Sequence, residues 1–121
     1  MPRSPDPESF IPVPVSEFQI LLAIADRDRH GYGIMTDVAA RTGGTVHLGP
    51  GTLYGSIKRM LAGGLIEESD RRPDPALDDD RRRYYRITTL GRAVARAEAR
   101  RMAELVAVAR GKRLLGRLEM V

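Results

Sequence analysis

The segment of residues 52–62 carries hydroxyl and cationic side chains but no carboxylate. Its apolar residues recur at helical spacing, so the polar side chains share the remaining surface of a predicted helix. These polar candidates are Thr52, Tyr54, Ser56, Lys58 and Arg59. Hydroxyl groups and Lys donate to phosphate oxygens, and Arg or Lys pairs with the edge of guanine. An ordinary solvated face is the alternative, but the lack of Asp and Glu favours a polyanion.

A second cationic cluster is the run of arginines at residues 81–83, which includes Arg82 and Arg83 and precedes two tyrosines. Arginines in such a position insert into a narrow minor groove or bind phosphates. Three aspartates at residues 78–80 directly precede the run, so local ion pairs are the alternative use of this charge. We expect some of these arginines to pair with the aspartates and only one or two to meet DNA.

The sequence His30-Gly31-Tyr32-Gly33 precedes another helical pattern of apolar residues. The backbone N–H groups and the positive dipole end of a helix N-terminus bind phosphate, and Gly31 permits close approach. A plain turn with a buried Tyr32 fits these residues equally well. Gly31 and Tyr32 are therefore candidate phosphate contacts.

Three short helices are predicted to position these groups. The first begins at Ser16, which has the spacing of a capping box with Gln19, and it carries a wide apolar face. The second begins near Gly31, and the third has Thr52 as a candidate N-cap. Fewer than ten residues separate the second helix from the third, which is the scale of a helix-turn-helix.

Two strands and a long helix complete the pattern. The strands are predicted at residues 65–69 and 82–88 with a long loop between them, and Tyr85 is expected in the core because it shares a face with Ile87. An Ala- and Arg-rich helix is predicted at about residues 90–118, with a heptad-like apolar stripe. So long a helix cannot bury itself on a small domain, so it should project and pack on another chain.

The predicted fold class is mainly α with a small β-hairpin: a winged helix-turn-helix followed by a long C-terminal dimerisation helix. With 121 residues, of which 42% are hydrophobic and 30% charged, the chain is expected to form one small globular unit. We expect residues 1–14 to form a flexible or extended arm, residues 15–88 the winged domain and residues 89–121 the dimerisation helix. In this architecture the third helix lies in the major groove of DNA.

Composition argues against several other classes. The chain has no cysteine, which rules out disulfides, thiolate zinc sites and cysteine nucleophiles. His30 and His47 lack an evident set of carboxylate partners, so we expect no enzyme, no metal and no cofactor. No apolar run is long enough to span a membrane, and we expect a cytoplasmic protein. The net charge is +4, with 18 Arg against 2 Lys, a ratio that a high-GC genome explains in part.

Several short motifs occur in order along the chain: HGYGI at 30–34, LGPGTLY at 48–54, GLI at 64–66, RYYRIT at 83–88 and LG at 90–91. Together they resemble the PadR family of bacterial transcriptional regulators. The resemblance implies a homodimeric winged-helix protein that binds double-stranded DNA, usually as a repressor of a nearby gene. The single C-terminal helix is similar to the short subfamily, which implies dimerisation through this helix with help from the first.

The resemblance points to Tyr54 and Lys58 on the third helix, to Gly31 and Tyr32 at the start of the second, and to the predicted wing. It also allows a small hydrophobic or phenolic effector, because some family members bind planar drugs between aromatic side chains, notably tryptophans. The chain has no Trp, so such a pocket would use other residues, which otherwise form only the dimer core. These residues are Phe18, Leu22, Met102 and Val106.

Two other functions fit a winged helix. One is a module that binds protein or RNA, because a fold does not determine a function. The other is an architectural DNA-binding protein without sequence preference. The affinity for duplex DNA and its salt dependence separate these functions. The basic C-terminal helix is either a solvated face or a second contact with DNA or with an acidic partner.

Overall fold

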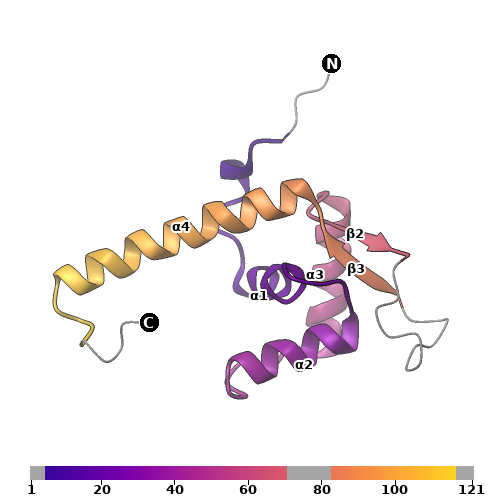
Figure 1. Cartoon of the computed structure of the whole chain (residues 1–121), viewed down its shortest axis with the longest axis horizontal. Coiled ribbons are helices and arrows are strands. Elements are labelled where there is room, and N and C mark those ends of the chain that lie inside the picture. The colour runs from indigo at the N-terminus through magenta and orange to yellow at the C-terminus, as the bar shows by residue number, and fades with distance from the viewer. Residues whose placement is uncertain (1–4, 71–82, 117–121) are drawn as a thin grey trace.

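The computed structural model describes residues 5–70 and 83–116. Helices dominate this part of the chain, and a small sheet lies at one end of the long C-terminal helix (Figure 1). The elements in chain order are the 3-10 helix η1 (Pro7–Phe10), α1 (Val15–Ile24), β1 (Arg29–His30), α2 (Gly31–Arg41), α3 (Pro50–Ala62), β2 (Ile66–Ser69), β3 (Tyr84–Ile87) and α4 (Thr89–Gly111). The mainly helical winged helix-turn-helix that the sequence predicts is confirmed.

Helix α1 lies at the centre of the packed domain. Ile20, Leu21 and Ala23 are fully buried, and the helix packs against α2, α3 and α4. A helix that is apolar on most sides is buried on most sides, which accounts for the wide apolar face. Phe18 also lies in this core, with only 8% exposed, which corrects its assignment to a subunit interface or effector pocket.

The first helix begins one residue before the predicted start. Helix α1 begins at Val15, directly after Pro14, so Ser16 lies inside the helix and the predicted capping box is wrong. The hydroxyl oxygen of Ser16 instead lies 3.3 Å from that of Ser56 on α3. Ser16 therefore connects two helices rather than capping the start of one.

The third helix begins at Pro50, two residues before the predicted start. Proline is favoured at the first helical position because its φ is already helical and its missing N–H has no partner there. Thr52 therefore lies in the first turn rather than at the N-cap. The long helix is capped by Thr88, whose Oγ1 accepts a hydrogen bond of 2.9 Å from the Gly91 N–H.

The sheet has three short antiparallel strands in the order β1-β3-β2. In the middle strand β3, Arg86 lies opposite Glu67 and Tyr84 lies opposite His30. The sequence does not predict β1, because two residues carry no periodicity. Tyr85 is buried as predicted, but Tyr84 is buried as well, since the ring of His30 packs edge-on against it with 5.2 Å between centroids.

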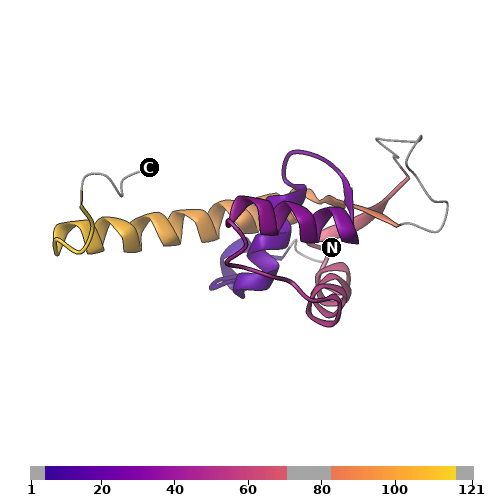
Figure 2. The same ribbon diagram turned by 90° about the horizontal axis from the view of Figure 1, so that it is seen from below.

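Helix α4 has two halves with different surroundings. The first half packs against α1 and η1, and it buries Val94 and Ala97. The second half extends beyond the domain in both views (Figures 1 and 2), and its Leu105 and Val106 are 56% and 43% exposed. The helix ends at Gly111 rather than near residue 118, because glycine is a poor helix former.

The described N-terminal residues pack against the domain. Helix η1 lies on α4, the side chains of Phe10 and Ile11 pack against the core, and Val13 is buried. Asp6 caps η1 by accepting a hydrogen bond of 3.0 Å from the Glu8 N–H. Residues 5–14 therefore contact the domain through a 3-10 helix and an extended segment, because their apolar side chains have a surface on which to be buried.

Candidate nucleic-acid interface

The exposed face of α3 carries the hydroxyl and ammonium groups that the sequence indicates. Leu53 and Ile57 turn inward and are buried, which leaves Thr52, Tyr54 and Lys58 facing solvent. The side chain of Tyr54 is 51% exposed. Within the described residues, no hydrogen bond or ion pair holds these three side chains, so their donors are available to a phosphate or a base.

Two of the predicted contacts on α3 are instead directed toward α1. Ser56 is fully buried beside Ser16, which corrects its assignment to the DNA-facing surface. The side chain of Arg59 is 65% exposed, but its Nε lies 3.3 Å from Glu17 Oε1. Its Nη2 also donates to Ser56 Oγ at 3.1 Å. Residue 56 lies three positions after the buried Leu53, so the two share the inward face of the helix.

The start of α2 lies beside Tyr54. A Cβ atom at Gly31 would lie 2.5 Å from Tyr54 Oη, so the glycine leaves room for this hydroxyl. Tyr32 is 62% exposed, which excludes a turn around a buried Tyr32. His30 Nδ1 accepts a hydrogen bond of 3.0 Å from the Gly33 N–H and so caps the helix. The Tyr54 hydroxyl and the N-terminus of α2 therefore adjoin each other on one surface.

The described arginines of the wing are paired with glutamates of the neighbouring strand. Arg83 Nη1 lies 3.1 Å from Glu68 Oε1, and Arg86 Nε lies 2.8 Å from Glu67 Oε1. The hydrogen bond and the charge of Glu67 hold the pKa of Arg86 above its ordinary value. The exposed surface of strands β2 and β3 therefore carries balanced charge.

The loop of the predicted hairpin falls in residues 71–82, outside the described residues, and so do Arg82 and the three aspartates expected to pair with the arginines. Sequence reasoning missed the glutamates of β2 as partners. Opposite charges that face each other across an antiparallel pair stabilise the sheet. The adjacent glutamates at residues 67–68 could have indicated these ion pairs, because the hairpin register places them opposite residues 85–86.

Apolar side chains are exposed on α1 and on the second half of α4. Val15 and Leu22 on α1 are 64% and 39% exposed, and Leu105 and Val106 on α4 are 56% and 43% exposed. Met102 is only partly buried and packs against the core. Clusters of exposed apolar side chains on a soluble protein mark an interaction surface.

Glu98 is fully buried on α4, and its role was not predicted from the sequence. Its carboxylate accepts two hydrogen bonds from Arg101, of 2.8 and 2.7 Å. The bond from Arg101, and after it one from the backbone of Val13, lowers the pKa of Glu98. A signal was present in the sequence, because Glu98 lies midway between Val94 and Met102 on the inward stripe of the helix.

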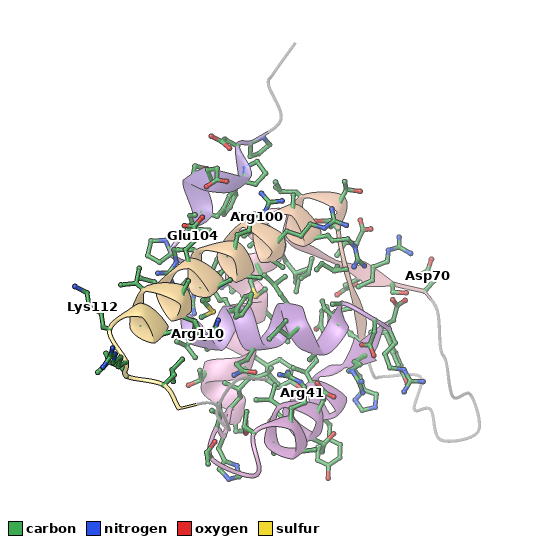
Figure 3. All side chains as sticks on the ribbon, turned by 60° about the vertical axis from the view of Figure 1, so that its left-hand side comes forward. Arg41, Asp70, Arg100, Glu104, Arg110 and Lys112 are labelled. Atoms are coloured by element: carbon green, nitrogen blue, oxygen red, sulfur yellow. The ribbon has the colours of Figure 1, made fainter. Side chains whose placement is uncertain are left out.

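The outer face of α4 is rich in cations. Arg100, Arg110 and Lys112 are exposed along the helix, with Glu104 among them (Figure 3). A solvated face and a second contact with a polyanion both fit this arrangement. Long cationic side chains keep their charged ends in water while their stems cover the helix.

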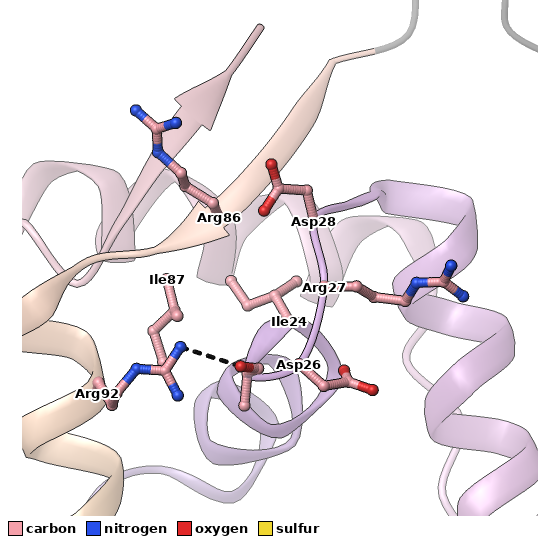
Figure 4. Close-up of a pocket in the computed structure, with 8 residues that line it drawn as sticks. Ile24, Asp26, Arg27, Asp28, Arg86, Ile87 and Arg92 are labelled. Carbon is pink, nitrogen blue, oxygen red and sulfur yellow. Dashed lines mark hydrogen bonds between the residues drawn. The ribbon is translucent and has the colours of Figure 1, made fainter. Parts of the chain in front are cut away.

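A hollow of about 330 Å³ lies where the end of α1 approaches β3 and the start of α4 (Figure 4). Asp28, Arg86 and Arg92 are among its lining residues, and none of the predicted effector residues lines it. Arg92 Nη2 donates to the Ala25 carbonyl oxygen at 3.0 Å, while Arg86 pairs with Glu67. Arg86 and Arg92 are therefore already satisfied by the protein.

The described residues lack two other kinds of feature, a metal site and a membrane-spanning helix. No three His, Cys, Asp or Glu side chains among them are grouped so that they could hold a metal ion. None of their helices combines the length and the apolar character that crossing a membrane requires.

The three-helix core, the hairpin beyond α3 and the uncovered donors of α3 define a winged helix-turn-helix protein of the DNA-binding class. Residues 20–97 match the Transcriptional regulator PadR-like family. The chain belongs to this family, which confirms the resemblance seen in its motifs. Membership also confirms the prediction of a transcriptional regulator rather than an enzyme.

Individual relatives support the same assignment. The chain is 36% identical over 86 residues to transcriptional regulator Rv3488 of Mycobacterium tuberculosis. The aligned residues are 71% of this chain and 74% of the relative. It is 33% identical over 86 residues to protein X of Lysinibacillus sphaericus, which covers 71% and 76%. A PadR-like transcriptional regulator from Bacillus cereus has a similar structure, with a TM-score of 0.65, 25% identity and coverage of 84% and 93%. A PadR family regulator from Clostridium difficile shares the fold, with a TM-score of 0.68, 23% identity and coverage of 85% and 100%.

Proposed function

We propose that the protein is a homodimeric repressor that binds a pseudo-palindromic operator in the cytoplasm. The observation that carries this proposal is the exposed face of α3, where Thr52, Tyr54 and Lys58 are free of partners within the described residues. A DNA-binding helix must present donors to the acceptor-rich edges and phosphates of the major groove. The repressor role rests on the resemblance to the family.

Each protomer would place α3 in a major groove. Lys58 would contact a phosphate or a guanine edge, and the Tyr54 hydroxyl would donate to a phosphate beside the start of α2. Tyr32 is exposed at that start and would flank the same phosphate. Two such helices related by a two-fold axis read half-sites about 10 bp apart.

The wing would contact the backbone or the minor groove next to α3. Arg83 is exposed, and its pair with Glu68 is a surface pair that a phosphate can replace. Arg82 stays a prediction from the sequence. Because the described strands carry balanced charge, we assign most of the DNA affinity to α3.

The second half of α4, together with α1, would form the subunit interface. Leu22, Met102 and Val106 are apolar and at least partly exposed, so pairing with a second copy would remove them from water. A small hydrophobic or phenolic effector would bind at this seam, among the same side chains. The absence of Trp means that aliphatic and thioether groups would surround it.

Fluorescence anisotropy tests the proposal with a duplex taken from directly upstream of the protein's own gene. A scrambled duplex of equal length is the control, and both are titrated at two salt concentrations. We expect tight, salt-sensitive binding that prefers the native duplex. Equal binding to both duplexes would instead support an architectural role, and no binding at low salt would support a protein-binding module.

A further inference from the structure

Glu17 on α1 lies against α3. Its side chain is only 14% exposed, and its Oε1 lies 3.3 Å from Nε of Arg59. A second hydrogen bond of 3.1 Å, from Arg59 Nη2 to Ser56 Oγ, orients the guanidinium. The oxygen of Ser56 also lies 3.3 Å from that of Ser16. Two consecutive residues of α1 therefore determine where one arginine of α3 lies.

The guanidinium of Arg59 lies at the edge of the α3 surface that carries the proposed DNA contacts, on the side that faces α1. Its Nη1 is 3.6 Å from the position that a Cβ atom of Gly55 would occupy. Residues 55 and 58 are neighbours on a helix surface, so the residue that this guanidinium approaches adjoins Lys58. The two cations differ in one respect: Arg59 is paired with Glu17, whereas Lys58 has no ion pair within the described residues.

We propose that Glu17 sets the DNA affinity of this protein by holding Arg59 back from the phosphates, an inference that rests on the DNA binding proposed above. Arg59 is then a positioning residue that ties α3 to α1. Lys58 is the cation that α3 contributes to the interface. Non-specific binding depends on phosphate neutralisation, so withholding one cation per protomer keeps that binding weak.

The size of the effect follows from the exposure of the arginine, which is 65% exposed although Glu17 is not. An ion pair in contact with solvent changes an equilibrium constant by about 1.5- to 5-fold, so releasing two of them in a dimer should raise DNA affinity by about 2- to 25-fold. One more phosphate contact per protomer steepens the slope of log K against log salt by about 0.9, or about 1.8 for the dimer. The gain should be equal on native and scrambled duplexes, because phosphates carry no sequence.

Four variants test the inference by anisotropy across a range of salt, each checked for folding by thermal denaturation. They are Glu17→Gln, Arg59→Gln, the double variant and Glu8→Gln. Glu8 is exposed on η1 and has no ion pair within the described residues, so its variant makes the same change of net charge at another place. We expect Glu17→Gln to bind more tightly with a steeper slope, Glu8→Gln to match the wild type and the double variant to lose the gain.

Two results would overturn the inference. One is wild-type affinity and slope in a folded Glu17→Gln protein. The other is an undiminished gain in the double variant, which would mean that Glu17 repels DNA directly. If Glu17→Gln does not fold, Arg59→Gln decides: it should weaken binding much less than Lys58→Gln, and equal losses overturn the inference. A wild type that binds no duplex overturns the proposed function as well, whereas wild-type binding with an unchanged Glu17→Gln overturns this inference alone.

Discussion

Two exposed helical surfaces of this protein differ in chemistry. Helix α3 presents the hydroxyl and ammonium groups of Tyr54 and Lys58, whereas the second half of α4 presents Leu105 and Val106. Polar donors stay hydrated at little cost and exchange water for phosphate, while apolar side chains gain by leaving water. One surface therefore suits DNA and the other suits a second copy of the chain. A small protein can divide recognition and assembly between two helices.

The largest effect is expected from Val106→Asp on the assembly surface. A carboxylate buried without a partner in an apolar seam costs about 3 kcal/mol or more, so dimerisation should weaken at least about 100-fold. Sedimentation velocity over a range of protein concentrations measures this change. The distribution should shift from dimer to monomer.

Val108→Asp is the matched control for this prediction. Val108 is 59% exposed, and its variant introduces the same carboxylate in place of valine. It lies about 200° around the helix from Val106. We expect the control to remain dimeric. A monomeric control beside a dimeric Val106→Asp protein would place the seam on the opposite face of α4.

The next largest effect is expected from Lys58→Ala on the recognition surface. Losing one solvent-exposed phosphate contact costs about 1 kcal/mol per protomer, the typical net value of a hydrogen bond, so a dimer should bind its operator about thirtyfold more weakly. The slope of log K against log salt should fall by about 1.8. Anisotropy titrations at several salt concentrations give both quantities, and the thermal midpoint should not change because the side chain is exposed.

Lys112→Ala removes the only other lysine, which follows the last turn of α4. The two variants lose the same side chain from two different surfaces. Wild-type affinity in Lys112→Ala confines DNA binding to the domain that contains α3. A comparable loss would show that the basic end of α4 also touches DNA.

A smaller effect, on stability, is expected from Glu98→Gln, which changes the buried partner of Arg101 in α4. The amide keeps the shape but loses the ionised partner of Arg101, so the free energy of unfolding should fall by about 1.5 kcal/mol at neutral pH. Urea denaturation measures this difference. The DNA affinity of the folded dimer should not change.

The pH dependence of that difference has a defined sign. Because Arg101 lowers the pKa of Glu98 in the folded protein, the ionised carboxylate stabilises the fold above its ordinary pKa of 4.5. This stabilisation is lost as the pH falls through the lower, folded pKa. The gap between wild type and Glu98→Gln should therefore close in acid, and a gap independent of pH would argue against the ion pair as its source.

Much of the fold could be predicted because it depends on local patterns. Apolar residues at helical spacing indicate α1, α2 and α3, and the Ala- and Arg-rich run with its heptad-like stripe indicates α4. The motifs that resemble the family indicated the class of protein. The two-residue β1 and the packing of η1 could not be predicted, because both depend on surfaces supplied by distant segments.

The site was predicted by residue type but only partly by orientation. Tyr54 and Lys58 are exposed as expected, since the helical period alone turns them outward. Ser56 and Arg59 have the right chemistry but are directed toward α1, through contacts with residues about 40 positions earlier in the chain. A helical period cannot say which neighbouring helix will cover the margin of an exposed face.

The smallest effect is expected from Gly31→Ala, which tests how the recognition surface is positioned. The new methyl group would lie 2.5 Å from Tyr54 Oη, and this exposed hydroxyl must move while the fold tolerates the change. DNA affinity should fall by about two- to fivefold, because the displaced Tyr54 hydroxyl would form a weaker hydrogen bond to the phosphate. Gly33→Ala is the matched control in the same helix, where the nearest atom lies at an ordinary 3.5 Å. Tyr54→Phe completes the comparison: once its hydroxyl is gone, adding Gly31→Ala should cause little further loss, and an additive loss would separate the two residues.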